Sequence, residues 1–397
     1  MLITVNAQTG TPEEAADWVR YVNIEKKGHV RYWEVGNELY NNNTMRPDQY
    51  ADRLHRFAQA MRAVDPSIQI GAIGPDNYPR IFSGNNWTEQ VLSRVGGEVD
   101  FFSVHNGYAP VLTSDPNWDV RTVYSAMLAA PKLVEANLTD VSKKLQQQPS
   151  TRGREIKIAV TEWGPLFQGT PQDRFVDHTK TLASGLYTAS MMKVLLENPH
   201  VEIANFFKLV DPLFAGWIGM RGGKPIPKPT YLAFQMYTHH FGRVLLGSST
   251  VSPTYDSLSV GWVDAVKDVP YLETVASRSD DGRTLYLMVI NKNFDQEMRA
   301  NIDLRGFSPA SEGKAWTLSG PGIDANTGTE LFQAPGVKWT QQAEDEKNPR
   351  FRKGDPGEVM IVPSRVANVG RTFQYNFPPR SVTAIEIARE EGRPTRH

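Results

Sequence analysis

The sequence predicts an α/β fold followed by an all-β module. Over roughly the first two-thirds of the 397 residues, short apolar runs alternate with segments of helical periodicity, which is typical of βα units around a parallel sheet. After residue 242 this alternation ends, and strand patterns are separated by Gly, Pro, Asn and Asp. We therefore expect an α/β domain at 1–242, a β-sandwich at 243–390 and a loose, charged tail at 391–397.

Six segments of the first domain have the apolar, β-branched composition of buried parallel strands. They are Leu2–Asn6, Val30–Gly36, Ile68–Ile73, Val99–Val104, Ile156–Glu162 and Ile203–Val210. Strands that alternate with helices in this way favour a (β/α)8-type barrel, the TIM barrel, but six units are two fewer than a complete barrel needs.

A helical pattern follows each of these strands. The first begins at Thr11, whose side chain is suited to an N-cap, with Pro12 in the first turn. The second covers Pro47–Val64 and is stopped by Asp65-Pro66. The remaining helices are expected at Trp87–Val95, Val120–Gln147, Arg174–Glu197 and Thr230–Phe241. In the second domain, strands are expected at Thr284–Asn291, Lys314–Leu318, Glu358–Val362, Arg371–Phe377 and Ser381–Ile387.

The composition excludes several classes of function. Lys plus Arg, 43, nearly equals Asp plus Glu, 44, so we expect neither nucleic acid nor an anionic membrane as a partner. The chain has no Cys, its 8 His are scattered, and it carries no phosphate-binding loop, so no metal and no cofactor is expected. No apolar run approaches the ~20 residues that span a bilayer. The start of the chain does not have the pattern of a secretory signal, which favours a cytoplasmic location.

Two strands end on a glutamate. The first motif is Tyr32-Trp33-Glu34-Val35-Gly36-Asn37-Glu38, and the second is Ile158-Ala159-Val160-Thr161-Glu162-Trp163-Gly164. In barrel enzymes the chemistry lies at the C-terminal ends of the strands, where Glu38 and Glu162 are placed. Two facing carboxyl groups, roughly 5–5.5 Å apart, are the layout of a retaining glycoside hydrolase.

These motifs resemble the acid/base and nucleophile motifs of clan A glycoside hydrolases, and within that clan the sequence most resembles family 51, the α-L-arabinofuranosidases. The opening stretch from Ile3 to Ala15 is similar to the third strand and helix of that family's barrel, and Phe373–Ile387 is similar to the closing strands of its C-terminal sandwich. The resemblance implies that the first two βα units are absent, that Glu38 is the acid/base and that Glu162 is the nucleophile.

The resemblance also implies a set of substrate contacts. Asn37 would hydrogen-bond the sugar 2-hydroxyl. Members of the family commonly have a His followed closely by a Tyr that hydrogen-bonds the nucleophile. Here the corresponding stretch is His105-Asn106-Gly107-Tyr108, with the Tyr one place further on. We expect His105 and Tyr108 to line the pocket.

Other candidates come from their positions in the barrel. Trp163 follows the nucleophile and is a candidate sugar-stacking wall, and Asp211 and Trp217 follow the last strand of the α/β domain on the same face. Glu34 has the same strand parity as Glu38 but lies deeper, so we expect it to form a structural ion pair inside the barrel.

The sequence therefore predicts a retaining glycosidase that degrades plant cell-wall oligosaccharides, with α-L-arabinofuranosides as the expected substrates. Two alternatives stay open: a β-xylosidase or a β-glucanase (cellulase) of the same clan, and a non-catalytic carbohydrate-binding barrel remnant. A barrel without two units would also leave two strand edges unpaired. We therefore expect a homo-oligomer that associates through this gap, covering Ile3, Val5, Phe206 and Leu209.

Overall fold

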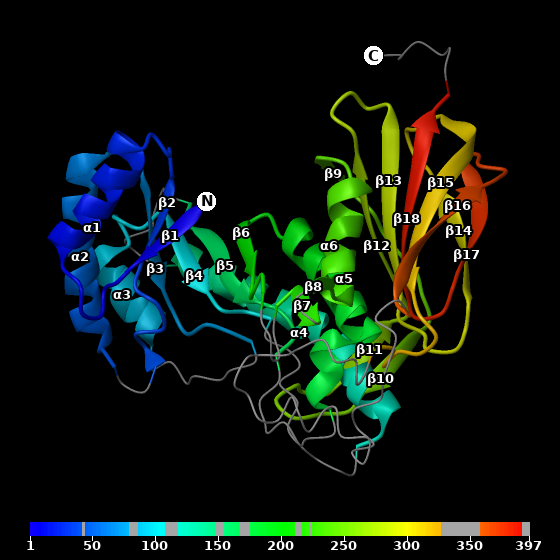
Figure 1. Ribbon diagram of the computed structural model, residues 1–397, viewed down its shortest axis with the longest axis horizontal. Helices are drawn as coiled ribbons and strands as arrows, with labels where there is room; N and C mark the ends of the chain where they lie inside the picture. The colour runs from blue at the N-terminus through cyan, green and yellow to red at the C-terminus, as the bar shows by residue number, and fades with distance from the viewer. Residues whose placement is uncertain are drawn as a thin grey trace. The chain divides into compact units, whose positions relative to one another are not determined.

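The computed structural model describes residues 1–41, 44–78, 86–107, 118–147, 155–166, 175–210, 216–221, 224–326 and 358–390. It divides into two compact units, each formed by several stretches of chain (Figure 1). The barrel unit contains Met1–Tyr108, Leu133–Trp163 and Asn198–Phe206. The sandwich unit contains Ala109–Lys132, Gly164–Glu197 and Phe207–His397. The domain boundary predicted at residue 242 stays a prediction.

The barrel unit is built on a six-stranded parallel sheet in which the strands follow one another in chain order. Its strands are β1 (Leu2–Val5), β2 (Tyr32–Val35), β3 (Gln69–Ile73), β4 (Phe101–Val104), β5 (Lys157–Trp163) and β6 (Val201–Phe206). The sheet is curled: the Tyr32 hydroxyl on β2 donates a hydrogen bond to the Glu202 carboxylate on β6, although three strands lie between β2 and β6 in the sheet. All six strands predicted from the sequence are thus present, with ends that differ from the predicted ones by up to four residues.

Helices follow the strands of this sheet. They are α1 (Pro12–Val19), α2 (Pro47–Val64), α3 (Trp87–Val95) and α4 (Val120–Gln147), of which α4 is shared between the two units. The Thr11 side chain accepts a hydrogen bond from the Glu14 backbone N–H at 3.2 Å, which confirms the predicted cap of α1. That helix continues as a wider π-helical turn over Arg20–Glu25. Helix α2 buries the side chains of Tyr50, Leu54, Phe57 and Met61 and ends at Asp65, as predicted.

Two helices belong to the sandwich unit, α5 (Leu182–Glu197) and α6 (Pro229–His239). The sequence predicted that this helix begins at Arg174. Residue 174 lies outside the described residues, and the described residues before Leu182 do not belong to α5, so the prediction was wrong there. A separate 3-10 turn, Val176–Lys180, comes first, and Thr181 then takes an extended conformation and donates its hydroxyl to the His178 carbonyl. This extended residue separates the turn from the helix. The antiparallel pair β7 (Ile218–Arg221) and β8 (Lys224–Pro227) was not predicted.

The β module consists of one six-stranded sheet and two strand pairs. The sheet has the order β16-β15-β18-β13-β12-β9, and the pairs are β14–β17 and β10–β11. The bounds are β9 (Val244–Leu246), β10 (Thr254–Ser257), β11 (Val266–Pro270), β12 (Leu272–Arg278), β13 (Thr284–Asn291), β14 (Met298–Asp303), β15 (Pro309–Ser319), β16 (Met360–Val366), β17 (Thr372–Phe377) and β18 (Ser381–Arg389). One apolar core lies between the large sheet and the β14–β17 pair, and it includes Leu287, Ala315, Ile385, Phe373 and Phe377. Within the described residues, no helix has the length and apolarity needed to cross a membrane.

Candidate active site

The turn after β2 places Glu38. The Gly36 N–H donates to the Val5 carbonyl at 3.0 Å and ends the strand pairing. Gly36 has φ +85°, a backbone conformation that strains any residue with a Cβ, and a Cβ here would also come within 2.8 Å of Leu39 Cδ1. Glu38 itself has φ +49°, a left-handed conformation that costs a non-glycine residue of order 1–3 kcal/mol. The hydrogen bond from the Asn41 N–H to the Glu38 carbonyl, 2.9 Å, helps to hold it there.

The end of β5 places Glu162. The pairing of β5 with β6 shifts register between Val160 and Trp163, so the regular alternation of side chains is interrupted at this point. Thr161 donates its hydroxyl to Glu34 Oε1 at 3.2 Å, while the next residue, Glu162, reaches within 3.7 Å of His105 Nδ1. The irregularity therefore lets two consecutive side chains of β5 contact residues of two other strands, Glu34 on β2 and His105 directly after β4.

His105, directly after β4, joins the two glutamates. Its Nδ1 lies 2.8 Å from Glu38 Oε1 and 3.7 Å from Glu162 Oε2, and its ring is buried. One ligand atom from each of the three side chains lies within 4.8 Å of the other two. The two carboxylates are thus as close as those of retaining glycosidases, roughly 5–5.5 Å.

The charges of these groups are coupled. The hydrogen bond with His105 lowers the pKa of Glu38 against the opposing effect of burial, and the Asn41 side chain, donating to Glu38 Oε2 at 3.0 Å, lowers it further. Burial alone would lower the pKa of His105, but the hydrogen bond with Glu38 and the charges of Glu162, Glu38 and Glu34 together raise it. These opposite shifts favour the proton on His105 and the charged form of Glu38 in the free site.

Known proteins resemble this chain in sequence. The model of the α-L-arabinofuranosidase C-terminal domain matches residues 161–353. An exo-α-(1→6)-L-arabinofuranosidase of Bifidobacterium longum is 23% identical over 400 residues, covering 86% of this chain and 74% of its own. An intracellular exo-α-(1→5)-L-arabinofuranosidase of Bacillus subtilis is 26% identical over 309 residues, covering 74% of this chain and 58% of its own.

Solved structures resemble the chain over nearly its whole length. The α-L-arabinofuranosidase of Thermotoga maritima, in its arabinose complex, superimposes with a TM-score of 0.76 at 24% identity, over 98% of this chain and 75% of that chain. The GH51 enzyme of Thermotoga petrophila gives a TM-score of 0.75, also at 24% identity, over 97% and 75%. The chain is a family 51 arabinofuranosidase-like glycoside hydrolase. Its fold is a TIM-like barrel architecture with a C-terminal β domain, which confirms the predicted fold class at this level.

Several predicted substrate contacts of this glycoside hydrolase can be located. Asn37 is exposed directly before Glu38. Trp163 is only 1% exposed and packs edge-to-face against Phe206, with ring centroids 5.1 Å apart. Trp217 belongs to the sandwich unit and lies 4.1 Å from the Phe234 ring. Their roles as sugar contacts stay predictions. Two other candidates, Tyr108 and Asp211, lie outside the described residues.

Among the residues that the structure describes, Glu34 has no partner for the ion pair predicted for it. Among the described residues, its hydrogen-bond partners are the hydroxyls of Thr4, 2.6 Å from Oε2, and of Thr161. The reason is the register of the sheet: Thr4 lies opposite Glu34 on β1, so a hydroxyl takes the place where a cation was expected. The buried carboxylate thereby adds negative charge beneath the two glutamates, and its charge is one of those that raise the pKa of His105.

Three contributors were missed by the sequence analysis, namely Asn41, Asn77 and Tyr40. Asn77 Oδ1 accepts a hydrogen bond from the His105 backbone N–H at 2.8 Å, and Tyr40 lies where the charges of both glutamates act on its hydroxyl. Asparagines in loops after strands are common, so only the proximity of Tyr40 and Asn41 to Glu38 in the sequence signalled them. The group of Glu38, His105 and Glu162 is close enough to bind a metal, and the predicted absence of one stays a prediction.

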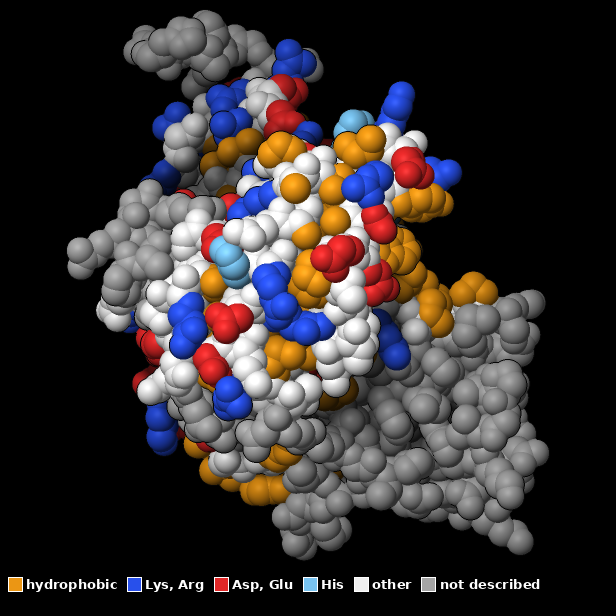
Figure 2. Space-filling view, turned by 90° about the vertical axis from the view of Figure 1, so that its left-hand side faces the viewer, with side chains coloured by type: hydrophobic (Ala, Val, Ile, Leu, Met, Phe, Trp, Pro, Cys, Tyr) orange, Lys and Arg blue, Asp and Glu red, His pale blue; other side chains and the backbone are white. Residues whose placement is uncertain are grey.

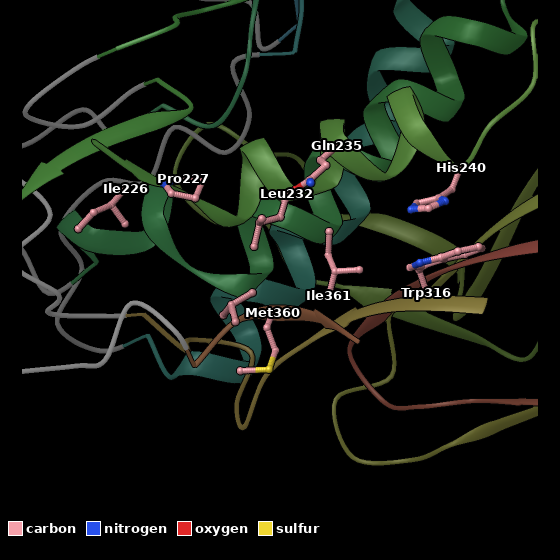
Figure 3. A pocket seen from close by; sticks show the side chains of 9 residues that line it. Ile226, Pro227, Leu232, Gln235, His240, Trp316, Met360 and Ile361 are labelled. Atoms are coloured by element: carbon pink, nitrogen blue, oxygen red, sulfur yellow. The ribbon is translucent and has the colours of Figure 1, made fainter. Parts of the chain in front are cut away.

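Apart from this site, a cavity of about 600 Å³ lies within the sandwich unit (Figure 3). His240 and Trp316 stack face to face along one part of its lining, with ring centroids 3.9 Å apart, and His240 Nδ1 lies 2.9 Å from the Glu386 carboxylate. Leu232 and Met360 are among the aliphatic side chains that make up most of the rest. This lining offers few polar groups for sugar recognition.

Proposed function

We propose that the chain hydrolyses terminal α-L-arabinofuranosides with retention of configuration, using Glu38 as acid/base and Glu162 as nucleophile. The observation that carries this proposal is the pair of strand-end carboxylates whose closest atoms lie within 4.8 Å, bridged by His105. The relatives named as exo-acting arabinofuranosidases support the choice of sugar. The expected substrates are arabinose-bearing oligosaccharides from plant cell walls.

The reaction proceeds by two displacements at the anomeric carbon. The ionised Glu162 carboxylate attacks that carbon while Glu38 donates its proton to the leaving glycosidic oxygen, which gives an ester between the sugar and Glu162. Glu38, now ionised, removes a proton from water, and the resulting attack on the anomeric carbon releases the sugar and restores both glutamates. Formation of the ester removes the charge of Glu162, which allows the pKa of Glu38 to fall between the two steps.

His105 supplies the proton that this scheme needs. A carboxylic acid that starts the reaction protonated needs a raised pKa, whereas in the free site the hydrogen bond with His105 lowers the pKa of Glu38, and the pKa of His105 is raised. Transfer of that proton over the 2.8 Å hydrogen bond from Nδ1 to Glu38 Oε1 gives neutral His105 and a protonated acid. No proton needs to enter from solvent before the first step.

The test of this proposal removes the nucleophile. Glu162→Ala should lower the turnover of an aryl α-L-arabinofuranoside by roughly a thousandfold or more. Added azide should restore turnover and give the glycosyl azide of inverted configuration, because azide takes the place of the missing carboxylate. A Glu162→Ala enzyme with near-normal rates would contradict the assignment. Oligosaccharide binding without any product from the unmodified chain would instead favour a non-catalytic binding protein.

The choice of sugar has its own test. A panel of aryl arabinofuranoside, xyloside, glucoside and cellobioside, together with β-glucan, separates the arabinofuranosidase from the xylosidase and glucanase alternatives. We expect kcat/KM to be highest for the arabinofuranoside. The direct contacts proposed for this sugar are Asn37, as a donor or acceptor for the 2-hydroxyl, and the side chains of Tyr108, Trp163, Asp211 and Trp217.

We further propose that β1–β6 correspond to the third to eighth strands of a complete barrel, and that the chain self-associates at the gap. Among the described residues, β1 pairs only with β2 and β6 only with β5, so each has one edge without a strand partner. Val5 is already buried within the chain, contrary to expectation, whereas Ile3 and Phe206 are half-buried and Leu209 is exposed. The exposed surface of Ile3, Phe206 and Leu209 is therefore what a second copy of the chain would cover.

A further inference from the structure

Two buried asparagines join the segments that follow β3 and β4. Asn77, after β3, is 3% exposed, and its Oδ1 accepts the His105 backbone N–H at 2.8 Å. Asn106, after β4, is fully buried, and its Oδ1 accepts the Tyr78 backbone N–H at 3.0 Å. The Gly107 N–H also donates to the Tyr78 carbonyl at 2.9 Å. Each segment therefore holds the backbone of the other, with one asparagine side chain acting in each direction.

The orientation of both amides is fixed by their partners. A backbone N–H can only donate, so the atom that it meets in each asparagine is the oxygen. In Asn106 this leaves Nδ2 to donate to Asn137 Oδ1 on α4. Asn137 lies in the part of α4 that belongs to the barrel unit. Asn106 is thus held by a helix of the same unit as well as by the segment after β3.

These hydrogen bonds fix the backbone that carries the His105 imidazole. Residues 105–107 all bond to residues 77–78, by backbone or by side chain, so the backbone at His105 cannot shift without breaking one of these bonds. The imidazole Nδ1 lies 2.8 Å from Glu38 Oε1 and 3.7 Å from Glu162 Oε2. Proton transfer between two groups needs hydrogen-bond distance, so a displacement of this ring by about 1 Å would interrupt the transfer to Glu38.

We propose that Asn77 and Asn106 are positioning residues for the reaction: together they hold the His105 imidazole at the distance from Glu38 at which its proton can be transferred. This inference rests on the proposed function, in which His105 supplies the proton. Buried polar side chains that make their hydrogen bonds rigidify a site and select a single arrangement of it. Apolar side chains in the same places would fill the volume without fixing the backbone at His105.

The protonation of His105 reports on its position. Burial lowers the pKa of His105, but the hydrogen bond with Glu38 and the charges of the nearby glutamates raise it by more. Weakening this hydrogen bond should therefore lower the pKa of His105. The described titratable groups on the surrounding elements are Glu34, Glu38 and Tyr40 on β2 and the turn after it, Asp76 after β3, Glu89 on α3, Lys144 on α4 and Glu162 on β5.

The test uses Asn77→Ala and, separately, Asn106→Ala. Each variant removes the acceptor of one backbone N–H and leaves Glu38, His105 and Glu162 in place. We expect kcat for an aryl arabinofuranoside to fall about tenfold, with KM changed by less than about twofold, because the contacts with the sugar are kept. The pKa of His105, followed by NMR of its ring, should fall. The basic limb of kcat/KM should move to lower pH, because the proton is then lost at lower pH.

Asn23→Ala is the matched control. Asn23 is also buried in the barrel unit, and its Oδ1 accepts the Val30 N–H at 2.8 Å, the same distance as between Asn77 and His105. Val30 precedes β2, so this contact lies at the other end of the strands from the two glutamates. Asn23→Ala should unfold at a lower urea concentration, as the other two alanine variants do, but keep its kcat and its pH profile.

Asn77→Asp covers the case in which the alanine variants do not fold. It keeps an oxygen at the accepting position in the same volume, so the His105 N–H keeps its partner. This variant should retain most of kcat, and the pKa of His105 should not fall, because an added negative charge nearby raises it. A lowered pKa of His105 together with a lowered kcat in Asn77→Asp would overturn the inference, since the accepting oxygen is still present.

The outcomes separate the two proposals. If Glu162→Ala is rescued by azide but folded Asn77→Ala and Asn106→Ala keep kcat within about twofold with an unmoved pKa of His105, the positioning role is overturned and the proposed function stands. If Glu162→Ala retains activity, the proposed function itself fails. Lowered activity with the pH profile of the unmodified chain would also overturn the inference, because a purely structural loss reduces activity without moving the limb.

Discussion

At Glu38, both the backbone and the carboxylate are fixed before a substrate is bound. The left-handed φ of +49° is held by the turn that follows, and the carboxylate oxygens are bound by His105 and Asn41. Binding groups in a productive geometry in advance reduces the entropy lost on the way to the transition state. The sequence motif Gly36-Asn37-Glu38 thus fixes the orientation of the Glu38 side chain, and the glycine is needed at the point where the strand ends.

The first prediction concerns the acid/base. Glu38→Ala should lower kcat/KM strongly for substrates with poor leaving groups, because these need the proton, and much less for an aryl glycoside with a highly acidic phenol. Its glycosyl-enzyme should accumulate, and added azide should release it as the azide of retained configuration. The measurement is a series of aryl arabinofuranosides of different leaving-group pKa, with the azide products analysed by NMR. An equal loss across the series would contradict the role of Glu38 as the acid.

The second prediction concerns His105. Its pKa is raised in the free site, so the unmodified enzyme should keep its catalytic proton to a pH above the ordinary range of a histidine. In His105→Gln the hydrogen bond that lowers the pKa of Glu38 is lost, and the proton must be held by Glu38 itself, a carboxyl group whose ordinary pKa lies below that of a histidine. The basic limb of kcat/KM should therefore move to lower pH. His55→Gln is the control. His55 lies on α2, and its Nδ1 is 2.6 Å from the Glu98 carboxylate, so this variant removes a different histidine–glutamate pair and should leave the basic limb unmoved.

At the scale of elements, the helices with strong periodicity could be predicted, whereas several strands of the β module were missed. The bounds of α2, α3 and α4 agree with the prediction, because each has an apolar stripe and flanking residues that mark its ends. The strand β14 was missed although Met298, Ala300 and Ile302 alternate with polar residues, which is the pattern of a half-buried strand. Its partner β17 lies about 70 residues away in the sequence, so the local sequence does not show which strand it pairs with.

Some residues of the site could likewise be predicted from the sequence and others could not. Glu38 and Glu162 were identified because each stands in a distinctive motif at a strand end. Asn77 was not, because its importance lies in what it contacts across the sheet. The position of Glu34 relative to a strand end was predictable, but the Thr4 and Thr161 hydroxyls that bind it depend on register, which the sequence does not specify.

The third prediction tests the start of α1. Thr11→Ala removes the side chain that accepts the Glu14 N–H, and loss of an N-cap of this kind costs about 1 kcal/mol of folding free energy. We expect a lower midpoint in urea with an unchanged slope, and normal kcat/KM once the protein is folded. Thr11→Ser keeps the acceptor and should restore most of the loss. A stability unchanged in Thr11→Ala would show that this helix start is not held by its cap.

At the scale of the whole molecule, the apolar surface is unevenly distributed. Helix α1 and the turn that follows it expose Trp18, Tyr21 and Ile24 by 51%, 48% and 54%, although these residues recur at the spacing of one helix face. Figure 2 shows the side of the molecule where α1 lies, with apolar side chains among charged ones. This helix follows β1, whose outer edge has no strand partner among the described residues, so an apolar helix face and an open strand edge belong to the same βα unit.

The fourth prediction is that this βα unit forms the contact in a homo-oligomer. Full burial of a large apolar side chain contributes roughly 1.5–3 kcal/mol, so covering Trp18, Tyr21, Ile24 and Ile3 together is a substantial driving force even though each is already partly buried. Trp18→Glu should shift the mass measured by light scattering toward the monomer at low micromolar concentration. Leu196→Glu, which changes a residue 42% exposed on α5, is the matched control and should leave the mass unchanged. A stable, active monomer of the unmodified chain at that concentration would contradict association through this unit, because the edge and the helix face would then be tolerated in water.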